Sequence, residues 1–229
     1  MRTAAVIPAR NEAQTVGAVV RTALQARRVD EVIVVDNASD DGTAAAATHA
    51  GARVVACLDE GKGQAMAAGV AATDAEIVVF LDADLIGLWP WHVDRLVDTV
   101  IEGTAGMACG LFDRGPVLNP IFLKALPILT GQRALHRTIF EALDARDIKG
   151  YKVEAALNSL CAERDLLVEA FVCTGLWHRT KEEKFNTPAE GFARKVSMLA
   201  VASWGYLSYS LRRRSRQARS RARRSRRTT

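Results

Sequence analysis

The fold is decided by the stretch Ile77-Val78-Val79-Phe80-Leu81-Asp82-Ala83-Asp84. Its first five residues form a continuous apolar run, which predicts a strand buried on both faces of a parallel sheet. The run Val32-Ile33-Val34-Val35 has the same character and also ends in an acid, Asp36. Ligands of open parallel sheets bind beyond the carboxyl ends of the strands. The sequence therefore predicts a ligand site at one edge of such a sheet.

Short β-branched runs alternate with alanine-rich helical patterns through the first half of the chain. Parallel neighbours need crossover connections, so this alternation predicts an α/β fold with helices on both faces of a mostly parallel sheet. We expect strands at residues 4–7, 31–35, 53–57 and 77–81, and helices at 16–25, 42–50, 63–72 and 91–101. Beyond Gly103 we expect strands at 107–112 and 166–174, an irregular apolar loop at 115–129, and helices at 134–143 and 151–164.

The composition is that of a soluble domain. The chain has 229 residues, 49% of them apolar, and a mean hydropathy of +0.01. Its four cysteines are far apart, so neither zinc-ligand spacing nor a disulfide framework is visible, and reduced buried thiols are expected. These are Cys57, Cys109, Cys161 and Cys173. With no signal-peptide pattern at the start and no apolar run of about 20 residues, a cytoplasmic protein is predicted.

The net charge of +5 hides an asymmetry. Residues 212–229 hold ten of the 31 basic residues and no acid, so the remaining body has 21 basic residues against 26 acidic ones. A pI near 9.2 would by itself suggest nucleic-acid binding. Here the basicity belongs to a tail, which we expect to be disordered, and the body is mildly acidic.

Asp82 and Asp84 are the strongest chemical signal. One carboxylate of such a pair can hold a hard divalent cation while the other faces a sugar, and Mg²⁺ or Mn²⁺ usually keeps substrate phosphate oxygens as further ligands. Taken alone, the pair is equally typical of a turn after a strand. The loops nearby contain neither a G-x-G-x-x-G nor a Walker motif, but Gly61-Lys62-Gly63 opens a helix whose N-terminus favours phosphate.

Four segments in order resemble the family 2 glycosyltransferases of the GT-A fold: residues 6–12, 35–43, 61–63 and 82–84. The resemblance covers about residues 1–185 and is closest to the small bacterial branch of polyprenyl-phosphate sugar transferases and glucosyl-3-phosphoglycerate synthases. It implies a UDP- or GDP-sugar donor and Mg²⁺ or Mn²⁺. It also implies one GT-A domain, with a nucleotide-binding half at 1–103 and an acceptor half at 104–185.

The resemblance assigns roles to individual residues of the first half. It places Lys62 near the nucleotide, Asp82 at the ribose or the donor sugar, where it would take part in catalysis, and Asp84 on the metal. It assigns four residues to the base and ribose pocket: Pro8, Arg10, Glu12 and Asp36.

In the second half, a small-residue loop before a helix borders the donor sugar and the acceptor in the resembled family. Three substrate-binding candidates are in this loop: Gly131, Gln132 and Arg133. A Gly-Tyr-x-x-Glu helix start then makes Glu154 the candidate base or acceptor-orienting acid, against the alternative of a first-turn glutamate that only complements the helix dipole. His178 is expected to complete a coordination shell begun by Asp84, against the alternative of a structural histidine.

In the C-terminal segment 186–211, residues 196–211 form an apolar stretch with Trp and Tyr just before the arginine tail. This pattern predicts an amphipathic helix at an anionic membrane surface, with a helix that docks on the sheet as the alternative. The apolar residues 121–129 would cover the acceptor cleft or touch lipid.

Two classes of function remain. The first is a metal-dependent glycosyltransferase at the inner face of the membrane that acts on polyprenyl-phosphate or another polar acceptor. Its family implies inversion, although the phosphoglycerate enzymes with a similar second half retain configuration. The second is a non-catalytic protein that binds nucleic acid through residues 212–229, which the acidic body disfavours. A nucleotidyltransferase is a third alternative, but its glycine-rich arginine loop is missing.

Overall fold

The structure, a computed structural model, describes residues 1–117, 119–120, 130–148 and 152–178. Its first half alternates strands with helices, as predicted. The strands are β1 (Thr3–Ala9), β2 (Glu31–Asp36), β3 (Arg53–Ala56) and β4 (Ile77–Phe80), and their pairings with one another are parallel. The helices are α1 (Val16–Gln25), α2 (Thr43–His49), α3 (Lys62–Ala71) and α4 (Pro90–Ile101).

The second half extends the same sheet and adds a small one. Its main strands are β6 (Met107–Phe112), β7 (Gln132–His136) and β8 (Val168–Cys173), and its helices are α6 (Arg137–Glu141) and α7 (Lys152–Glu163). The large sheet has the order β3-β2-β1-β4-β7-β6-β8, in which β7 runs antiparallel to both of its neighbours. A second sheet pairs β5 (Leu85–Ile86) with β9 (Trp177–His178). The mostly parallel α/β fold is confirmed.

The predicted helix at 134–143 is wrong in its first part. Residues 132–136 form β7, and the helix there, α6, spans only Arg137–Glu141. Alanine and leucine favour a helix locally, but β7 gains hydrogen bonds from both β4 and β6, and such pairing overrides local propensity. Much of the predicted loop at 115–129, the predicted helix at 186–211 and the tail lie outside the described residues.

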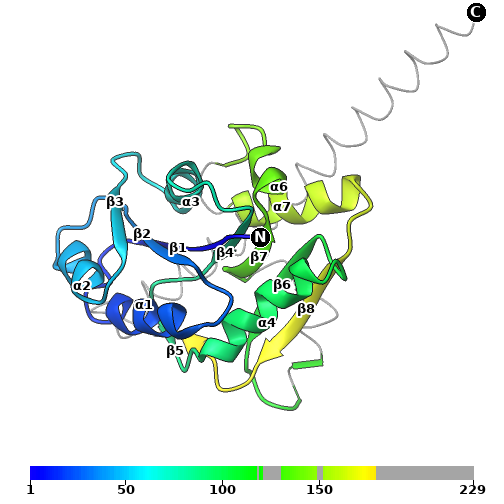
Figure 1. The fold of residues 1–229 in the computed structure, drawn as a ribbon, viewed down its shortest axis with the longest axis horizontal. Coiled ribbons are helices and arrows are strands. Elements are labelled where there is room, and N and C mark those ends of the chain that lie inside the picture. Colours follow the sequence, from blue (N-terminus) through cyan, green and yellow to red (C-terminus); the bar gives the residue numbers. More distant parts are fainter. Residues whose placement is uncertain (118, 121–129, 149–151, 179–229) are drawn as a thin grey trace, which may run out of the picture.

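Helices cover both faces of the sheet (Figure 1). Helices α1, α2 and α4 lie on one face, and α3, α6 and α7 lie on the other. Alternate residues of β4 reach the two cores, with Val79 packed on the α1 and α4 side and Phe80 on the α3 and α7 side. Burial on both faces is the physical reason for the continuous apolar runs, because neither face of these strands meets water.

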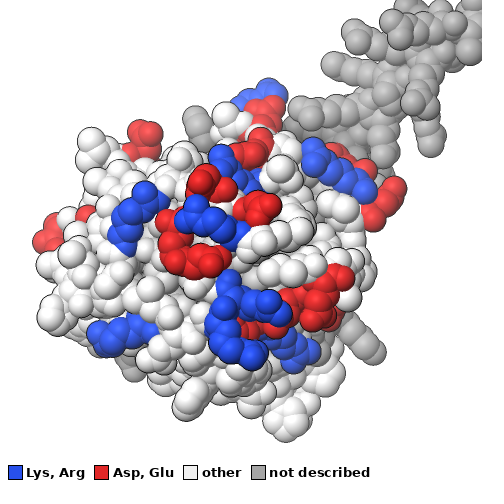
Figure 2. Space-filling model, viewed as in Figure 1, with Lys and Arg blue, Asp and Glu red and all other residues white. Residues whose placement is uncertain are grey.

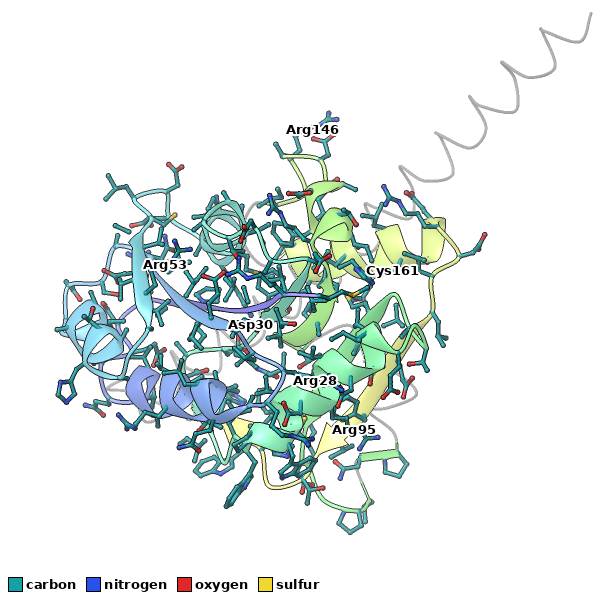
Figure 3. The ribbon with its side chains drawn as sticks, in the orientation of Figure 1. Arg28, Asp30, Arg53, Arg95, Arg146 and Cys161 are labelled. Atoms are coloured by element: carbon teal, nitrogen blue, oxygen red, sulfur yellow. The ribbon has the colours of Figure 1, made fainter. Side chains whose placement is uncertain are left out.

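The face of the molecule at the amino ends of β2 and β3 carries both signs of charge. Figure 2 shows acidic and basic side chains interspersed there, and Figure 3 places Asp30 and Arg53 at this edge. Arg2 Nη1 lies 2.7 Å from Asp74 Oδ1, and Arg28 pairs with Asp98. Mixed charges of this kind are typical of a solvated surface and differ from the single basic patch that binds nucleic acid.

All four cysteines are free and buried, as predicted. Burial raises the pKa of the Cys161 thiol to about 11 and that of Cys173 to about 12. Thiols with such pKa values are poor nucleophiles at neutral pH. Within the part of the chain that the structure describes, no helix is long and apolar enough to cross a membrane.

Helix α3 packs closely on the sheet at Gly69. A Cβ atom at this position would lie 2.3 Å from Val6 Cγ1 and 3.0 Å from Val35 Cγ2. We expect Gly69→Ala to lower the free energy of unfolding by about 1 to 3 kcal/mol, because the helix that carries Lys62 would be pushed off β1. Urea unfolding monitored by circular dichroism measures this change.

Gly17→Ala is the matched control. The nearest atom to a Cβ there is Arg21 Nη1 at 3.4 Å, the end of a flexible side chain, and alanine is the better helix former. We expect this variant to be as stable as the wild type or slightly more so. Equal stability of the two variants would contradict the close packing of α3 at Gly69.

Candidate active site

The predicted acids do gather at the carboxyl edge of the sheet. Asp36 is the last residue of β2 and pairs in register with Ala9 of β1, and Asp82 follows the end of β4 by two residues. Asp36 Oδ1 is buried and has no hydrogen-bond partner within the described residues. A buried carboxylate oxygen without a donor is costly, so its position is suited to a ligand that brings an N–H or O–H group.

The other residues of the predicted base and ribose pocket lie along the same edge. Pro8 is half-buried in β1, and Arg10 is exposed, with its Nη2 donating to Glu60 Oε1 at 3.0 Å. The main-chain N–H of Glu12 donates to Thr43 Oγ1 at 2.8 Å. Polar side chains of residues 39–43 thus hold the 11–13 turn in place.

Lys62 begins α3 and lies between two carboxylates from distant parts of the chain. Its Nζ is 2.7 Å from Asp82 Oδ1 and 2.6 Å from Glu154 Oε1. Burial alone would lower the pKa of Lys62, but the two carboxylates outweigh burial and raise that pKa above its ordinary value. Lys62 is therefore a stable cation that joins the start of α3 to the end of β4 and to the first turn of α7.

Each carboxylate oxygen of Asp82 accepts a hydrogen bond. In addition to the Lys62 contact, Gln132 Nε2 donates to Asp82 Oδ2 at 2.7 Å. Burial would raise the pKa of Asp82, but the charge and hydrogen bond of Lys62, with the bond from Gln132, hold it below its ordinary value. Gly131 lies against the same carboxylate, since a Cβ there would be 2.3 Å from both of its oxygens.

Arg133 differs from its predicted setting, because it is fully buried and lies on β7 and not in a loop before a helix. Its Nη2 donates to the carbonyl oxygen of Thr130 at 2.6 Å, and its Nη1 donates to that of Glu154 at 3.2 Å. These contacts tie the start of β7 to the first turn of α7. Substrate binding by Arg133 stays a prediction, whereas the observed contacts support the backbone around Glu154.

Glu154 reaches the site from the first turn of α7 and is 8% exposed. Its carboxylate points to Lys62, and the preceding Gly150 and Tyr151 lie outside the described residues. The carboxylate is therefore held against Lys62 inside the protein. A first-turn glutamate that only complements the helix dipole would instead face solvent.

Asp84 and His178 are brought together by the small sheet. Asp84 directly precedes β5, where Leu85 pairs with His178 of β9. The imidazole stacks on Phe112, with ring centroids 4.8 Å apart, and its charge also lowers the pKa of Asp82, after the larger effects of Lys62 and Gln132. His178 therefore faces the acids of the site.

Asp84 and His178 offer a carboxylate oxygen and an imidazole nitrogen, a donor set that suits a divalent cation. In the described ranges no group of three or more His, Cys, Asp or Glu residues is arranged to hold a metal ion. Two protein ligands fit a cation that takes its remaining ligands from substrate phosphate and water.

Sequence reasoning assigns no role to two residues that organise the site. Asn37 is buried and donates from Nδ2 to Asp59 O at 2.7 Å, while its Oδ1 accepts from Gly61 N at 2.9 Å. These bonds fix the turn before Lys62. Thr130 is buried beside Gln132. Their signal in the sequence is only a small polar residue within a polar loop, which is too common to single them out.

Comparison with known proteins identifies the family. Residues 4–151, more than half of the chain, match the model of the glycosyl transferase family 2. The chain belongs to this family. Its similarity to solved structures extends further, to 91% of the chain and 79% of the glucosyl-3-phosphoglycerate synthase of Mycobacterium tuberculosis in complex with Mn²⁺, UDP and glucosyl-3-phosphoglycerate, at 28% identity and a TM-score of 0.74. A second complex of that enzyme holds Mg²⁺ and UDP, with 27% identity, a TM-score of 0.69, and coverage of 88% of this chain and 79% of that one.

Curated relatives match over shorter segments. The glucosyl-3-phosphoglycerate synthase of Mycolicibacterium smegmatis is 42% identical over 106 residues, which is 42% of this chain and 35% of the relative. The 4,4'-diaponeurosporenoate glycosyltransferase of Staphylococcus aureus is 32% identical over 109 residues, 44% of this chain and 29% of the relative. The matches thus span about a third of these relatives. The family is established by these comparisons, and the substrates of this chain are a separate question.

The Lys62 contacts predict a pH-dependent loss of stability in Lys62→Met. At pH 7 we expect the free energy of unfolding to fall by about 2 to 3 kcal/mol, because two partly buried carboxylates would face each other without a cation. The lowered pKa of Asp82 contributes stability above its ordinary value of 3.8, and this contribution is lost as the pH falls through the folded-state pKa. The raised pKa of Lys62 contributes stability below 10.5 that is lost at higher pH.

The difference between wild type and Lys62→Met should therefore be largest between about pH 5 and pH 10 and smaller at pH 3, as measured by denaturant unfolding. Arg146→Met is the control, because Arg146 Nη2 forms an exposed ion pair with Asp144 at 2.7 Å. Its effect should stay below about 0.5 kcal/mol. A Lys62→Met deficit that is the same at every pH would contradict the ion-pair assignment.

Proposed function

We propose that this protein transfers a sugar from a UDP- or GDP-sugar to an acceptor with the help of a divalent cation. The observation that carries the proposal is the convergence of Asp82, Lys62 and Glu154 from β4, α3 and α7, beside Asp84 and His178. Membership of the family and the nucleotide complexes of the M. tuberculosis enzyme support it.

The nucleoside would bind along the ends of β1 and β2. The buried Oδ1 of Asp36 is free to accept the ring N–H that both uracil and guanine carry. Arg10 and Glu12 lie on the neighbouring loop, where they would border the base and ribose. This arrangement supports a donor with a nucleoside of that kind.

The diphosphate would lie between the start of α3 and the Asp84–His178 pair. A helix N-terminus favours phosphate, and Lys62 adds a fixed positive charge there. A divalent cation held by Asp84 and His178 would neutralise charge on the departing diphosphate. Asp82, fixed by two donors, would accept a hydrogen bond from a hydroxyl of the donor sugar.

We assign Glu154 to the binding or activation of the acceptor substrate. With a hydroxyl acceptor it would act as a base and accept the hydroxyl proton while the anomeric carbon becomes oxocarbenium-like; a phosphate acceptor is already ionised, and Glu154 would then only orient it. Lys62 already binds this carboxylate, so base action requires the ammonium to shift towards the diphosphate when the donor enters. Inversion of the anomeric centre with Glu154 as the base is part of the proposal.

The acceptor is proposed to be polyprenyl-phosphate or another polar molecule at the inner face of the membrane. The names of the relatives contain a phosphoglycerate and a diaponeurosporenoate, so related donor-binding halves occur with unlike acceptors. The apolar residues 121–129 and 196–211, with the arginines that follow, support a peripheral membrane location.

A donor screen tests the proposed activity. We expect the purified chain to release nucleotide from at least one member of a panel of UDP-, GDP- and dTDP-sugars in the presence of Mn²⁺. The release should stop when EDTA is added and should resume when excess Mn²⁺ is supplied. Asp84→Ala should lower this rate by on the order of 100-fold, because a main ligand of the cation is lost.

Asp74→Asn is the control for that screen, because Asp74 is exposed at the amino edge of the sheet, away from the acids of the site, and forms a surface ion pair with Arg2. Its rate should equal that of the wild type. No release from any donor, together with no metal-dependent shift of the melting temperature by UDP or GDP, would refute the proposed function.

The configuration of the product tests inversion. From an α-linked donor we expect a β-glycoside, because Glu154 would direct the acceptor to the face opposite the leaving diphosphate. The coupling constant of the anomeric proton in the NMR spectrum of the purified product measures this configuration. An α-glycoside would contradict both inversion and the base role of Glu154, while leaving the transfer reaction itself in place.

A further inference from the structure

Two buried polar side chains lie behind Asp82. Gln132 is fully buried on β7, and Thr130, two residues earlier, is 1% exposed. Thr130 Oγ1 lies 2.7 Å from Gln132 Oε1, and Gln132 Nε2 lies 2.7 Å from Asp82 Oδ2. Buried polar groups with partners on both sides form an oriented chain, which here runs from Thr130 through Gln132 to Asp82.

The chain has only one favourable orientation. Asp82 accepts hydrogen bonds and donates none when ionised, so the NH₂ group of Gln132 must face it. The amide oxygen of Gln132 then faces Thr130, whose hydroxyl is the available donor. The hydroxyl is also next to the carbonyl oxygen of Gly110 on β6, so its one proton is shared between this oxygen and the Gln132 amide oxygen. Asp82 and Thr130 therefore favour the same orientation of the Gln132 amide, with its NH₂ group on Asp82.

Asp82 is accessible to a substrate, whereas Gln132 is buried. The Asp82 side chain is 24% exposed, and its Oδ1 is held by Lys62. Gln132 has no exposed surface, and Gly131 leaves no room for a side chain between the backbone and the carboxylate. A donor sugar would therefore touch Asp82 and would not touch Gln132 or Thr130.

We propose that Thr130 and Gln132 are positioning residues that act on the donor sugar only through Asp82. This inference rests on the proposed function for its kinetic consequence, and it replaces the substrate contact predicted for Gln132. This chain of hydrogen bonds from Thr130 through Gln132 to Asp82, here called the relay, fixes the plane of the Asp82 carboxylate. The remaining lone pairs of the carboxylate then point to one place in the site. Preorganised acceptors of this kind favour a transition state because they need no reorientation.

A double-mutant cycle tests the relay without any substrate. Asp82→Asn replaces one acceptor oxygen by an NH₂ donor. When this donor faces Gln132, the Gln132 amide rotates so that its oxygen meets it, and the NH₂ group of Gln132 then faces the hydroxyl of Thr130. We expect Thr130→Val and Asp82→Asn to be non-additive by about threefold or more in the unfolding equilibrium constant, and additive in a Gln132→Met background. Thr99→Val is the matched control, because Thr99 is a buried threonine with a bonded hydroxyl on α4, and it should be additive with Asp82→Asn.

Steady-state kinetics test the consequence for transfer and need no Asp82 variant, so they remain decisive if Asp82→Asn does not fold. We expect Gln132→Met to lower kcat roughly tenfold, as for the loss of one hydrogen bond, with the dissociation constant of UDP changed less than about twofold. Thr130→Val should lower kcat in the same direction, and Thr130→Ser, which keeps the hydroxyl, should restore it.

Additivity of the cycle in the presence of Gln132 would overturn the relay. Equal kcat values for Thr130→Val and Thr130→Ser would also overturn it, as would a UDP affinity that falls as far as kcat does. If the wild-type chain turns over no nucleotide sugar, the proposed function fails, and the substrate-free cycle then decides the relay by itself.

Discussion

The site depends on one ammonium group between two carboxylates. Lys62 holds Asp82 at the end of β4 and Glu154 at the start of α7, and without it these two acids would repel each other in a partly buried place. Lys62, Asp82 and Glu154 are each supported by a buried polar side chain on the side away from the site. Asn37 fixes the turn before Lys62, Gln132 holds Asp82, and Arg133 binds the backbone of Glu154. These supports let the charged atoms converge at 2.6 to 2.7 Å.

Strand β7 links Asp82 to α7 because its neighbouring residues point to opposite faces of the sheet. Gln132 reaches Asp82 on one face, and Arg133 reaches the first turn of α7 on the other. The strand lies antiparallel between β4 and β6, which brings Arg133 directly beside Phe80 at the end of β4. A helix at this position would present Gln132 and Arg133 about 100° apart on one surface and could not serve both partners in this way.

The sequence predicts what depends on local pattern. Continuous apolar runs with terminal acids predict the parallel strands and place Asp36 and Asp82 at the correct edge. Strand β7 is not predictable in this way, because Gln132-Arg133-Ala134-Leu135 is neutral towards a strand until β4 and β6 pair with it. For the same reason Arg133, expected in a loop before a helix, lies buried on a strand. The placement of His178 beside Asp84 rests on a pairing between residues 85 and 178, which no local signal contains.

Charge explains why the proposed donor and the proposed cation belong together. Lys62, Asp82, Asp84 and Glu154 sum to two negative charges, and a nucleotide diphosphate would bring at least two more. Lys62 is already bound by two carboxylates, so it offsets only part of this charge. A divalent cation at Asp84 and His178 would lower the repulsion where acids and diphosphate meet, and the repulsion of like charges at such distances is worth several kcal/mol in a partly buried site. The donor should therefore bind weakly before the cation is in place.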